Sequence, residues 1–223
     1  MEKDFKYSKS EKRGLKLLKP SMEKILSIGI STGGSAEICM AKKCPKAHII
    51  ATTVDKKGLD FSNDKISNFK EKNQIEIKLE DVSKPMEYQD NTFDFIYARL
   101  VLHYLNKEEL NNALKELYRV LKPNGYLFIV ARNNKEWEIS KKEYIVDYDE
   151  INNMTTYYVQ GKKDEIAIRQ FLSEEQLKKV LYEHNFKIKS IKSYKERLYT
   201  DYERTKKNQS KKANSLTEVV AYK

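Results

Sequence analysis

Three apolar segments of the sequence each end in small or acidic residues that could contact a ligand. The first runs into the glycines of residues 24–40, KILSIGISTGGSAEICM, the second ends at Asp55, and Asp81 and Val82 follow the third. Glycines between a strand and a helix let the backbone approach a ligand closely. A carboxylate after the next strand can accept hydrogen bonds from ribose hydroxyls. The pattern predicts a site for a nucleoside-containing ligand.

The glycine spacing bears on which nucleoside that ligand contains. Dinucleotide sites typically follow the pattern G-x-G-x-x-G, which Gly29, Ser31 and Gly34 would fill here. The middle glycine of that pattern lets the backbone approach a pyrophosphate. Because Ser31 stands in its place, the turn argues against a nicotinamide dinucleotide.

Alternating strands and helices are expected to position these residues. Short β-branched or aromatic runs read as buried parallel strands at residues 25–28, 49–54, 75–79, 93–98 and 126–131. The clearest helix is predicted over residues 107–121, with Asn106 as its N-cap and Glu109 at its third position. Pro123 and the turn that follows it end this helix and begin the next strand.

The last third of the chain changes character. Residues 137–170 are polar and aromatic and contain a possible hairpin over 144–159. A capping box at 173–176 opens a further helix. Two more strands, 186–193 and 216–222, are joined without a helix and should therefore be antiparallel. We expect an α/β fold with a doubly wound, mostly parallel seven-stranded sheet that ends in an antiparallel hairpin.

Composition narrows the class of protein. A chain of 223 residues suggests one domain, and its two cysteines, Cys39 and Cys44, are too few for a disulfide framework. The charged N-terminus is unlike a signal peptide and no apolar run is long enough to span a membrane, so we expect a cytoplasmic protein with no membrane partner. The net charge of +10 leaves a nucleic-acid partner open, although the basic residues are spread along the chain. The densest basic run, residues 206–212, reads as a solvated loop.

Several segments together resemble the class I S-adenosylmethionine-dependent methyltransferases, of the small-molecule type grouped with ubiquinone and menaquinone methyltransferases. The matching segments are ILSIGISTG (25–33), VD (54–55), EDV (80–82), DNTFDFIYARLVLHYL (90–105), RVLKPNGYLFIV (119–130) and FLSEEQLKKVLYEHNFKI (171–188). The resemblance implies a Rossmann-like methyltransferase domain over 1–223, with S-adenosylmethionine as cofactor and S-adenosylhomocysteine as product. It also implies a small-molecule acceptor.

The resemblance assigns roles to individual positions. It implies that Gly29 and Gly33 flank the methionine and sugar, that Asp55 holds the ribose, and that Asp81 and Val82 hold the adenine. Ala98 and Arg99 would approach the methionine end, and Ser31 and Lys56 complete the expected cofactor set. Two positions depart from the family: Ser27 replaces an acid and Ser31 replaces a glycine. These departures keep a non-catalytic cofactor-binding relative open as an alternative.

The acceptor site is expected between an N-terminal lid segment, residues 1–23, and the insertion 137–170, as the resemblance implies. His103 follows the fourth strand and is the best candidate for a general base; the alternative is a histidine that packs or caps there. Aromatic side chains could sandwich a flat acceptor and Arg169 could pair with an acidic group, or these residues could form a satellite core. The candidate acceptor residues are Tyr7, His103, Tyr104, Trp137, Tyr157 and Arg169. Phe5 and Tyr7 stand alone in a polar leader and could close over the site.

Other functions stay open at this stage. An RNA methyltransferase fits the charge, but the fourth strand is followed by YARL (97–100) and not by the Asn/Asp-Pro-Pro-Tyr sequence typical of base amino methylation. No histidine, cysteine and acid cluster has the spacing of metal ligands, so no metal is expected. The sequence is compatible with a monomer or a homodimer.

Overall fold

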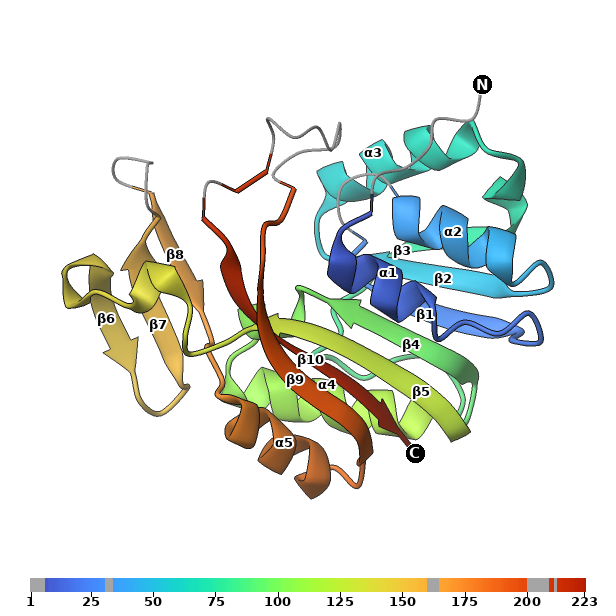
Figure 1. Cartoon of the computed structure of the whole chain (residues 1–223). Helices are drawn as coiled ribbons and strands as arrows, with labels where there is room; N and C mark the ends of the chain where they lie inside the picture. The colour runs from blue at the N-terminus through green and yellow to red at the C-terminus, as the bar shows by residue number, and fades with distance from the viewer. Residues whose placement is uncertain (1–6, 31–33, 160–164, 200–208, 211) are drawn as a thin grey trace.

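The computed structural model describes residues 7–30, 34–159, 165–199, 209–210 and 212–223. Its main feature is a seven-stranded sheet with the strand order β3-β2-β1-β4-β5-β10-β9 (Figure 1). The strands are β1 (Lys24–Ile28), β2 (His48–Thr53), β3 (Ile75–Leu79), β4 (Phe93–Arg99), β5 (Leu121–Arg132), β9 (Lys187–Glu196) and β10 (Asn214–Tyr222). The first five are parallel, and β10 is antiparallel to both β5 and β9. The predicted doubly wound sheet and its terminal hairpin are therefore confirmed.

Helices cover both faces of the sheet. In Figure 1, α1 (Lys9–Leu15), α2 (Ser35–Lys43) and α3 (Lys56–Ser67) lie on one face, and α4 (Lys107–Val120) and α5 (Glu174–Glu183) lie on the other. The predicted N-cap of α4, Asn106, and the predicted capping box of α5 are both confirmed, and Asn106 and Glu109 also form a capping box. The apolar stripe of α4 is buried in the larger core cluster with residues of β1, β4, β5 and α5. Amphipathic patterning therefore decides which helix faces turn toward the sheet.

A second, antiparallel sheet consists of β6 (Ile145–Asp149), β7 (Met154–Tyr158) and β8 (Ile166–Arg169). The predicted hairpin is confirmed as β6 and β7. The strand β8 was not predicted, because four residues that alternate between exposed and half-buried give little periodic signal. Figure 1 shows this small sheet at one side of the main sheet. In the chain it lies between β5 and α5.

Short 3₁₀ helices complete the described elements: η1 (Lys70–Gln74), η2 (Leu102–Tyr104), η3 (Trp137–Ile139) and η4 (Lys142–Tyr144). One boundary differs from the expectation. Strand β5 begins at Leu121, directly after α4, and the turn at Asn124, with φ 64°, lies inside it. The pairing of β4 with β5 shifts register between Phe93 and Phe95 to accommodate this turn.

The topology places the candidate site. The chain leaves β1 toward β2 on one side, while β4 lies on the other side of β1, so β1 and β4 form the switch point of the sheet. Ligands of open α/β sheets bind beyond the carboxyl ends of the strands at such a point. No helix in the described residues is long and apolar enough to span a membrane. Cys39 and Cys44 are both free thiols, with Cys44 buried.

Candidate functional site

After β1, both the backbone conformation and the close packing at Gly29 and Gly34 require glycine. Gly29 has a φ of +71°, and a Cβ there would lie 2.9 Å from Cγ2 of Val101. Gly34 has a φ of +63° at the N-cap of α2, and a Cβ there would lie 2.7 Å from Cδ1 of Ile66. Both positions combine a left-handed backbone with close packing, which only glycine accepts without strain. Ser31 and Gly33 lie outside the described residues.

Ser27, which stands where the resembled family has an acid, has a carboxylate partner. The hydroxyl of Ser27 on β1 donates a hydrogen bond to Oε1 of Glu37 over 2.6 Å, and both side chains are buried. Glu37, in the first turn of α2, therefore brings a carboxylate to the end of β1, where Ser27 stands in place of an acid. Glu37 was not identified from the sequence, since nothing in a helical glutamate indicates which strand residue it will meet.

Asp55 follows β2 and begins α3. Its carboxylate oxygens accept the backbone N–H groups of Lys57, over 3.0 Å, and of Gly58, over 3.1 Å. The side chain is nevertheless exposed, and two acceptor positions of the carboxylate remain after these two bonds. Asp55 therefore caps a helix and still has the capacity to accept hydroxyl groups. Lys56 is exposed at the first position of α3.

The residues after β3 divide into an exposed acid and a buried apolar side chain. Oδ1 of Asp81 accepts hydrogen bonds from the backbone N–H and the hydroxyl of Ser83, over 2.9 and 2.7 Å. Val82 is only 5% exposed and packs in the core, so it has little surface to offer a ligand in this conformation. The carboxylate of Glu80 accepts the hydroxyl of Tyr88 over 2.8 Å, and burial raises the pKa of Glu80. Glu80 and Tyr88 hold the loop that presents Asp81.

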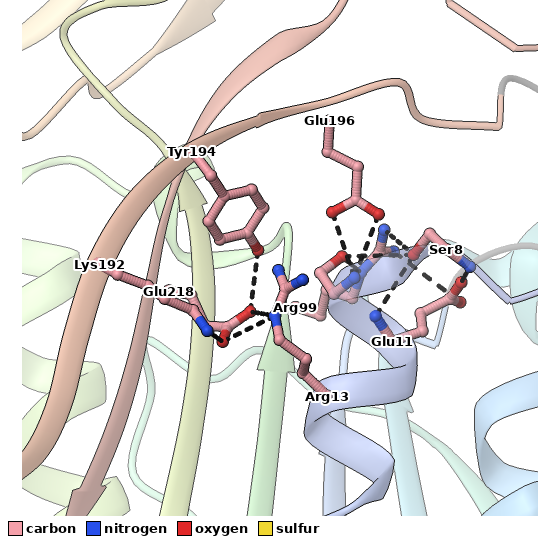
Figure 2. Close-up of polar contacts among 9 residues, drawn as sticks. Ser8, Glu11, Arg13, Arg99, Lys192, Tyr194, Glu196 and Glu218 are labelled. Carbon is pink, nitrogen blue, oxygen red and sulfur yellow. Dashed lines mark hydrogen bonds and ion pairs between the residues drawn. The ribbon is translucent and has the colours of Figure 1, made fainter.

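Ala98 and Arg99 end β4. Ala98 is fully buried in the core. The Arg99 guanidinium donates to the hydroxyls of Ser10, over 2.9 Å, and Ser8, over 2.8 Å, and lies 3.9 Å from a carboxylate oxygen of Glu11. Figure 2 shows Arg99 of β4 meeting Ser8 and Glu11 at the start of α1. The predicted cofactor contact is thus a guanidinium already bonded to the N-terminal helix.

Further contacts dock α1 on the sheet. Glu196 accepts the backbone N–H of Ser10, and Arg13 donates to Glu218 over 2.7 Å (Figure 2). Gly14 has the closest approach, because a Cβ there would lie 2.6 Å from the Phe128 ring. Ahead of α1, the Tyr7 hydroxyl donates to the backbone oxygen of Ser35, the first residue of α2, over 3.2 Å. The described N-terminal segment therefore bridges the ends of β4 and the start of α2. Phe5, the other predicted lid residue, lies outside the described residues.

His103 is buried in η2. It is 4% exposed, its ring stacks on Tyr104 with 4.6 Å between centroids, and its Nδ1 has no hydrogen-bond partner among the described residues. Burial, reinforced by the positive charges of Arg132 and Arg169, lowers the pKa of His103 well below its ordinary value. The imidazole is therefore neutral at physiological pH. The cavity that it helps to line is about 10 Å³, enough for roughly one water molecule.

Arg169 lies at the end of β8 with aromatic partners. It donates to the hydroxyls of Tyr157 and, over 3.4 Å, Tyr104, and its guanidinium carbon lies 4.8 Å from the centre of the Tyr104 ring. Its buried Nε has no hydrogen-bond partner within the described residues. Burial raises the pKa of Tyr157 to about 12, so its hydroxyl is neutral beside Arg169.

The same cluster reaches the segment after β5. The Tyr157 hydroxyl donates to Glu138 over 3.4 Å, and Glu138 also accepts a hydrogen bond from Arg132. Trp137 precedes Glu138, and the ammonium group of Lys212 lies 4.7 Å from the centre of its ring. Four of the six predicted acceptor residues are thus in contact with one another: His103, Tyr104, Tyr157 and Arg169. Trp137 joins them through its neighbour Glu138, whereas Tyr7 lies apart at α2. Arg132 and Glu138 were not identified from the sequence.

Comparisons with known proteins agree with this architecture. A family described as "Methyltransferase domain" matches residues 26–129. The phosphoethanolamine N-methyltransferase of Plasmodium falciparum is 29% identical over 125 residues, which are 55% of this chain and 45% of that protein. A demethylmenaquinone methyltransferase of Lactobacillus johnsonii is 32% identical over 98 residues, 44% of this chain and 39% of the relative. The chain thus spans less than half the length of these two relatives.

A solved structure has a similar fold over nearly the whole chain. The S-adenosylmethionine-dependent methyltransferase of Methanosarcina mazei superposes with a TM-score of 0.72 at 19% identity, covering 92% of this chain and 94% of its own. At this identity the likeness concerns the fold. The arrangement of strands and helices in Figure 1 is therefore one that a methyltransferase structure shares.

Proposed function

We propose that this chain, whose residues 26–129 match a family described as "Methyltransferase domain", transfers a methyl group from S-adenosylmethionine to a small-molecule acceptor. One observation carries the proposal. Three neighbouring parallel strands end, in order, at a glycine turn, at the exposed Asp55 and at the exposed Asp81. Such a row can receive an amino acid, a ribose and an adenine side by side.

The side chains at this edge fit that cofactor. The glycine turn leaves no room for a Cβ at Gly29, and the two unused acceptor positions of Asp55 suit two ribose hydroxyls. Asp81 uses only Oδ1 for Ser83, and Oδ2 has no hydrogen-bond partner among the described residues, so it can accept from an exocyclic amine. Glu37, buried and bonded to Ser27 at the end of β1, is the carboxylate that would face the amino-acid part of the cofactor.

We assign the acceptor an anionic group that binds at Arg169. This guanidinium is largely buried between two phenols, has an unpartnered Nε, and forms no ion pair with a carboxylate of the described residues. A guanidinium fork suits a phosphate or carboxylate. One relative is named for phosphoethanolamine, which is a phosphorylated amine, and this supports an acceptor of that class.

The chemistry asked of the protein is mainly positioning. When bound, S-adenosylmethionine supplies an activated methyl group, so the chain must align the acceptor for an in-line attack. Alignment of this kind can lower the barrier by roughly 7–11 kcal/mol. Neutral His103 has one unprotonated ring nitrogen, which can accept a proton only if the acceptor, or one water molecule, reaches its cavity. The low pKa makes it a weak base, suited to an acceptor that loses its proton readily.

Substitution of Arg169 tests the anionic acceptor. We would measure binding of phosphoethanolamine and of inorganic phosphate by calorimetry, in the presence of S-adenosylhomocysteine, for the wild type, Arg169→Gln and Arg169→Lys. Loss of charge-assisted hydrogen bonds should weaken binding by roughly 10- to 150-fold in Arg169→Gln. Arg169→Lys should recover only part of this, because the fork is lost. Arg13→Gln, which removes a guanidinium from the far side of the sheet, is the matched control. If neither compound binds the wild type, the anionic acceptor is wrong.

A further inference from the structure

A buried glutamate, Glu136, fixes the segment that follows β5. The proposed function assigns it no role. Glu136 is 0% exposed. Its carboxylate accepts two backbone N–H groups from different elements: Trp137, which begins η3, over 3.0 Å, and Ser215, the second residue of β10, over 3.1 Å. The side chain therefore ties the turn at 137–139 to the main sheet.

Neighbouring bonds make this tie specific. The backbone of Asn133 donates to Ser215, and that of Glu136 donates to Asn133. The Asn133 side chain donates to Thr217 on β10 over 3.0 Å. These bonds fix the turn against the start of β10. Glu138 follows Trp137 in this turn, and its carboxylate accepts hydrogen bonds from Arg132 and from Tyr157, one of the candidate acceptor residues.

Burying a glutamate at this position is energetically unfavourable. A buried carboxylate loses its hydration, and two N–H groups repay that loss only in part. Two charged groups act on it: Arg132, at the end of β5, favours its ionised form, and Glu138, in η3, opposes it. A neutral side chain could accept hydrogen bonds without this cost. Stability alone therefore does not explain an acid at this position, and its two hydrogen bonds point to a role in holding the segment after β5.

We propose that Glu136 is a positioning residue, whose carboxylate fixes Trp137 and Glu138 as one wall of the acceptor site. The assignment of that wall to an acceptor rests on the proposed function. The ionised carboxylate offers one oxygen to each N–H group, whereas the protonated acid weakens one of the two contacts. The position of the wall consequently depends on the protonation of Glu136.

Trp137 makes this testable without an acceptor or a cofactor, because it is the only tryptophan of the chain. Burial raises the pKa of Glu136 to about 7. The tryptophan emission of the wild type should therefore change between pH 5 and 9 with a midpoint near that value. The change should be absent in Glu136→Gln and retained in Glu196→Gln, a matched buried glutamate in the α1 docking cluster. A transition that persists in Glu136→Gln, or a flat wild-type profile, overturns the proposal.

Two additions keep the test decisive. If Glu136→Gln fails to fold by circular dichroism, Glu136→Asp should still show a pH-dependent emission of smaller amplitude, and a flat profile there counts against the proposal. At pH 8, inorganic phosphate should bind Glu136→Gln about tenfold more weakly than the wild type. Unchanged phosphate affinity would break the link between Glu136 and the acceptor wall. Phosphate that fails to bind the wild type refutes the anionic acceptor instead, and the fluorescence titration still decides the role of Glu136.

Discussion

Asp55 has two tasks that substitutions can separate. Its carboxylate caps α3 through two backbone N–H groups, and it is also the residue proposed to hold the ribose. Alanine removes both functions, whereas serine retains an N-cap and removes the carboxylate. The pair Asp55→Ala and Asp55→Ser therefore distinguishes a folding effect from a binding effect.

The expected magnitudes differ between the two variants. Loss of the cap should lower the free energy of unfolding of Asp55→Ala by about 0.5–2 kcal/mol, and serine should restore most of it. Loss of hydrogen bonds to a charged acceptor should cost both variants about 1.5–3 kcal/mol of binding free energy for S-adenosylmethionine. The second figure corresponds to roughly a 10- to 150-fold increase in Kd.

Urea unfolding and calorimetric titration with S-adenosylmethionine measure the two quantities. Asn106→Ala is the control, because Asn106 caps α4 through a capping box at a distance from the proposed ribose site. It should lose comparable stability and keep its cofactor affinity. Wild-type affinity in Asp55→Ser would refute the assignment of the ribose. A stability loss in Asp55→Ser equal to that in Asp55→Ala would refute the capping argument.

Four further outcomes are expected. Gly14→Ala should lower the free energy of unfolding by about 1–3 kcal/mol in urea, because its Cβ would meet the Phe128 ring; a neutral effect would mean that α1 shifts freely. In Arg99→Ala, trypsin should cleave the N-terminal segment faster than in Arg13→Ala, since Arg99, unlike Arg13, donates to the hydroxyls of Ser8 and Ser10; equal cleavage rates would contradict this. The pKa of Glu136 is raised from 4.5 to about 7, so the wild type should lose up to about 3 kcal/mol of stability relative to Glu136→Gln as the pH rises from 4.5 to 7.5. The pKa of His103 is lowered, so the wild type should instead lose stability relative to His103→Gln as the pH falls below about 6.5, and parallel curves would contradict a buried neutral imidazole.

The sequence was sufficient for most of the main sheet. Apolar runs bounded by turns predict β1 to β4 to within one residue at each end, because buried parallel strands carry a continuous apolar signal. The caps of α4 and α5 are local motifs and were equally readable. The strand β8 was missed for the opposite reason, since its stability comes from pairing with β7 and not from its own pattern.

The site was less readable where its contacts join distant parts of the chain. Arg99 could be placed at the end of a strand, but its engagement by Ser8 and Ser10 depends on how α1 docks. Glu37 meets Ser27, and Glu136 meets Ser215, only after the sheet has formed. Such pairs have no local signature, because their cause is tertiary packing.

Transfer of a labelled methyl group is the most direct test of the proposed reaction. S-adenosylmethionine labelled in its methyl group would be incubated with the protein and an extract of its own cells, and small molecules, RNA and protein would then be separated. We expect label in the small-molecule fraction, in a compound that carries a phosphate or carboxylate. Label in RNA, or no transfer by a protein that binds the cofactor, would contradict this.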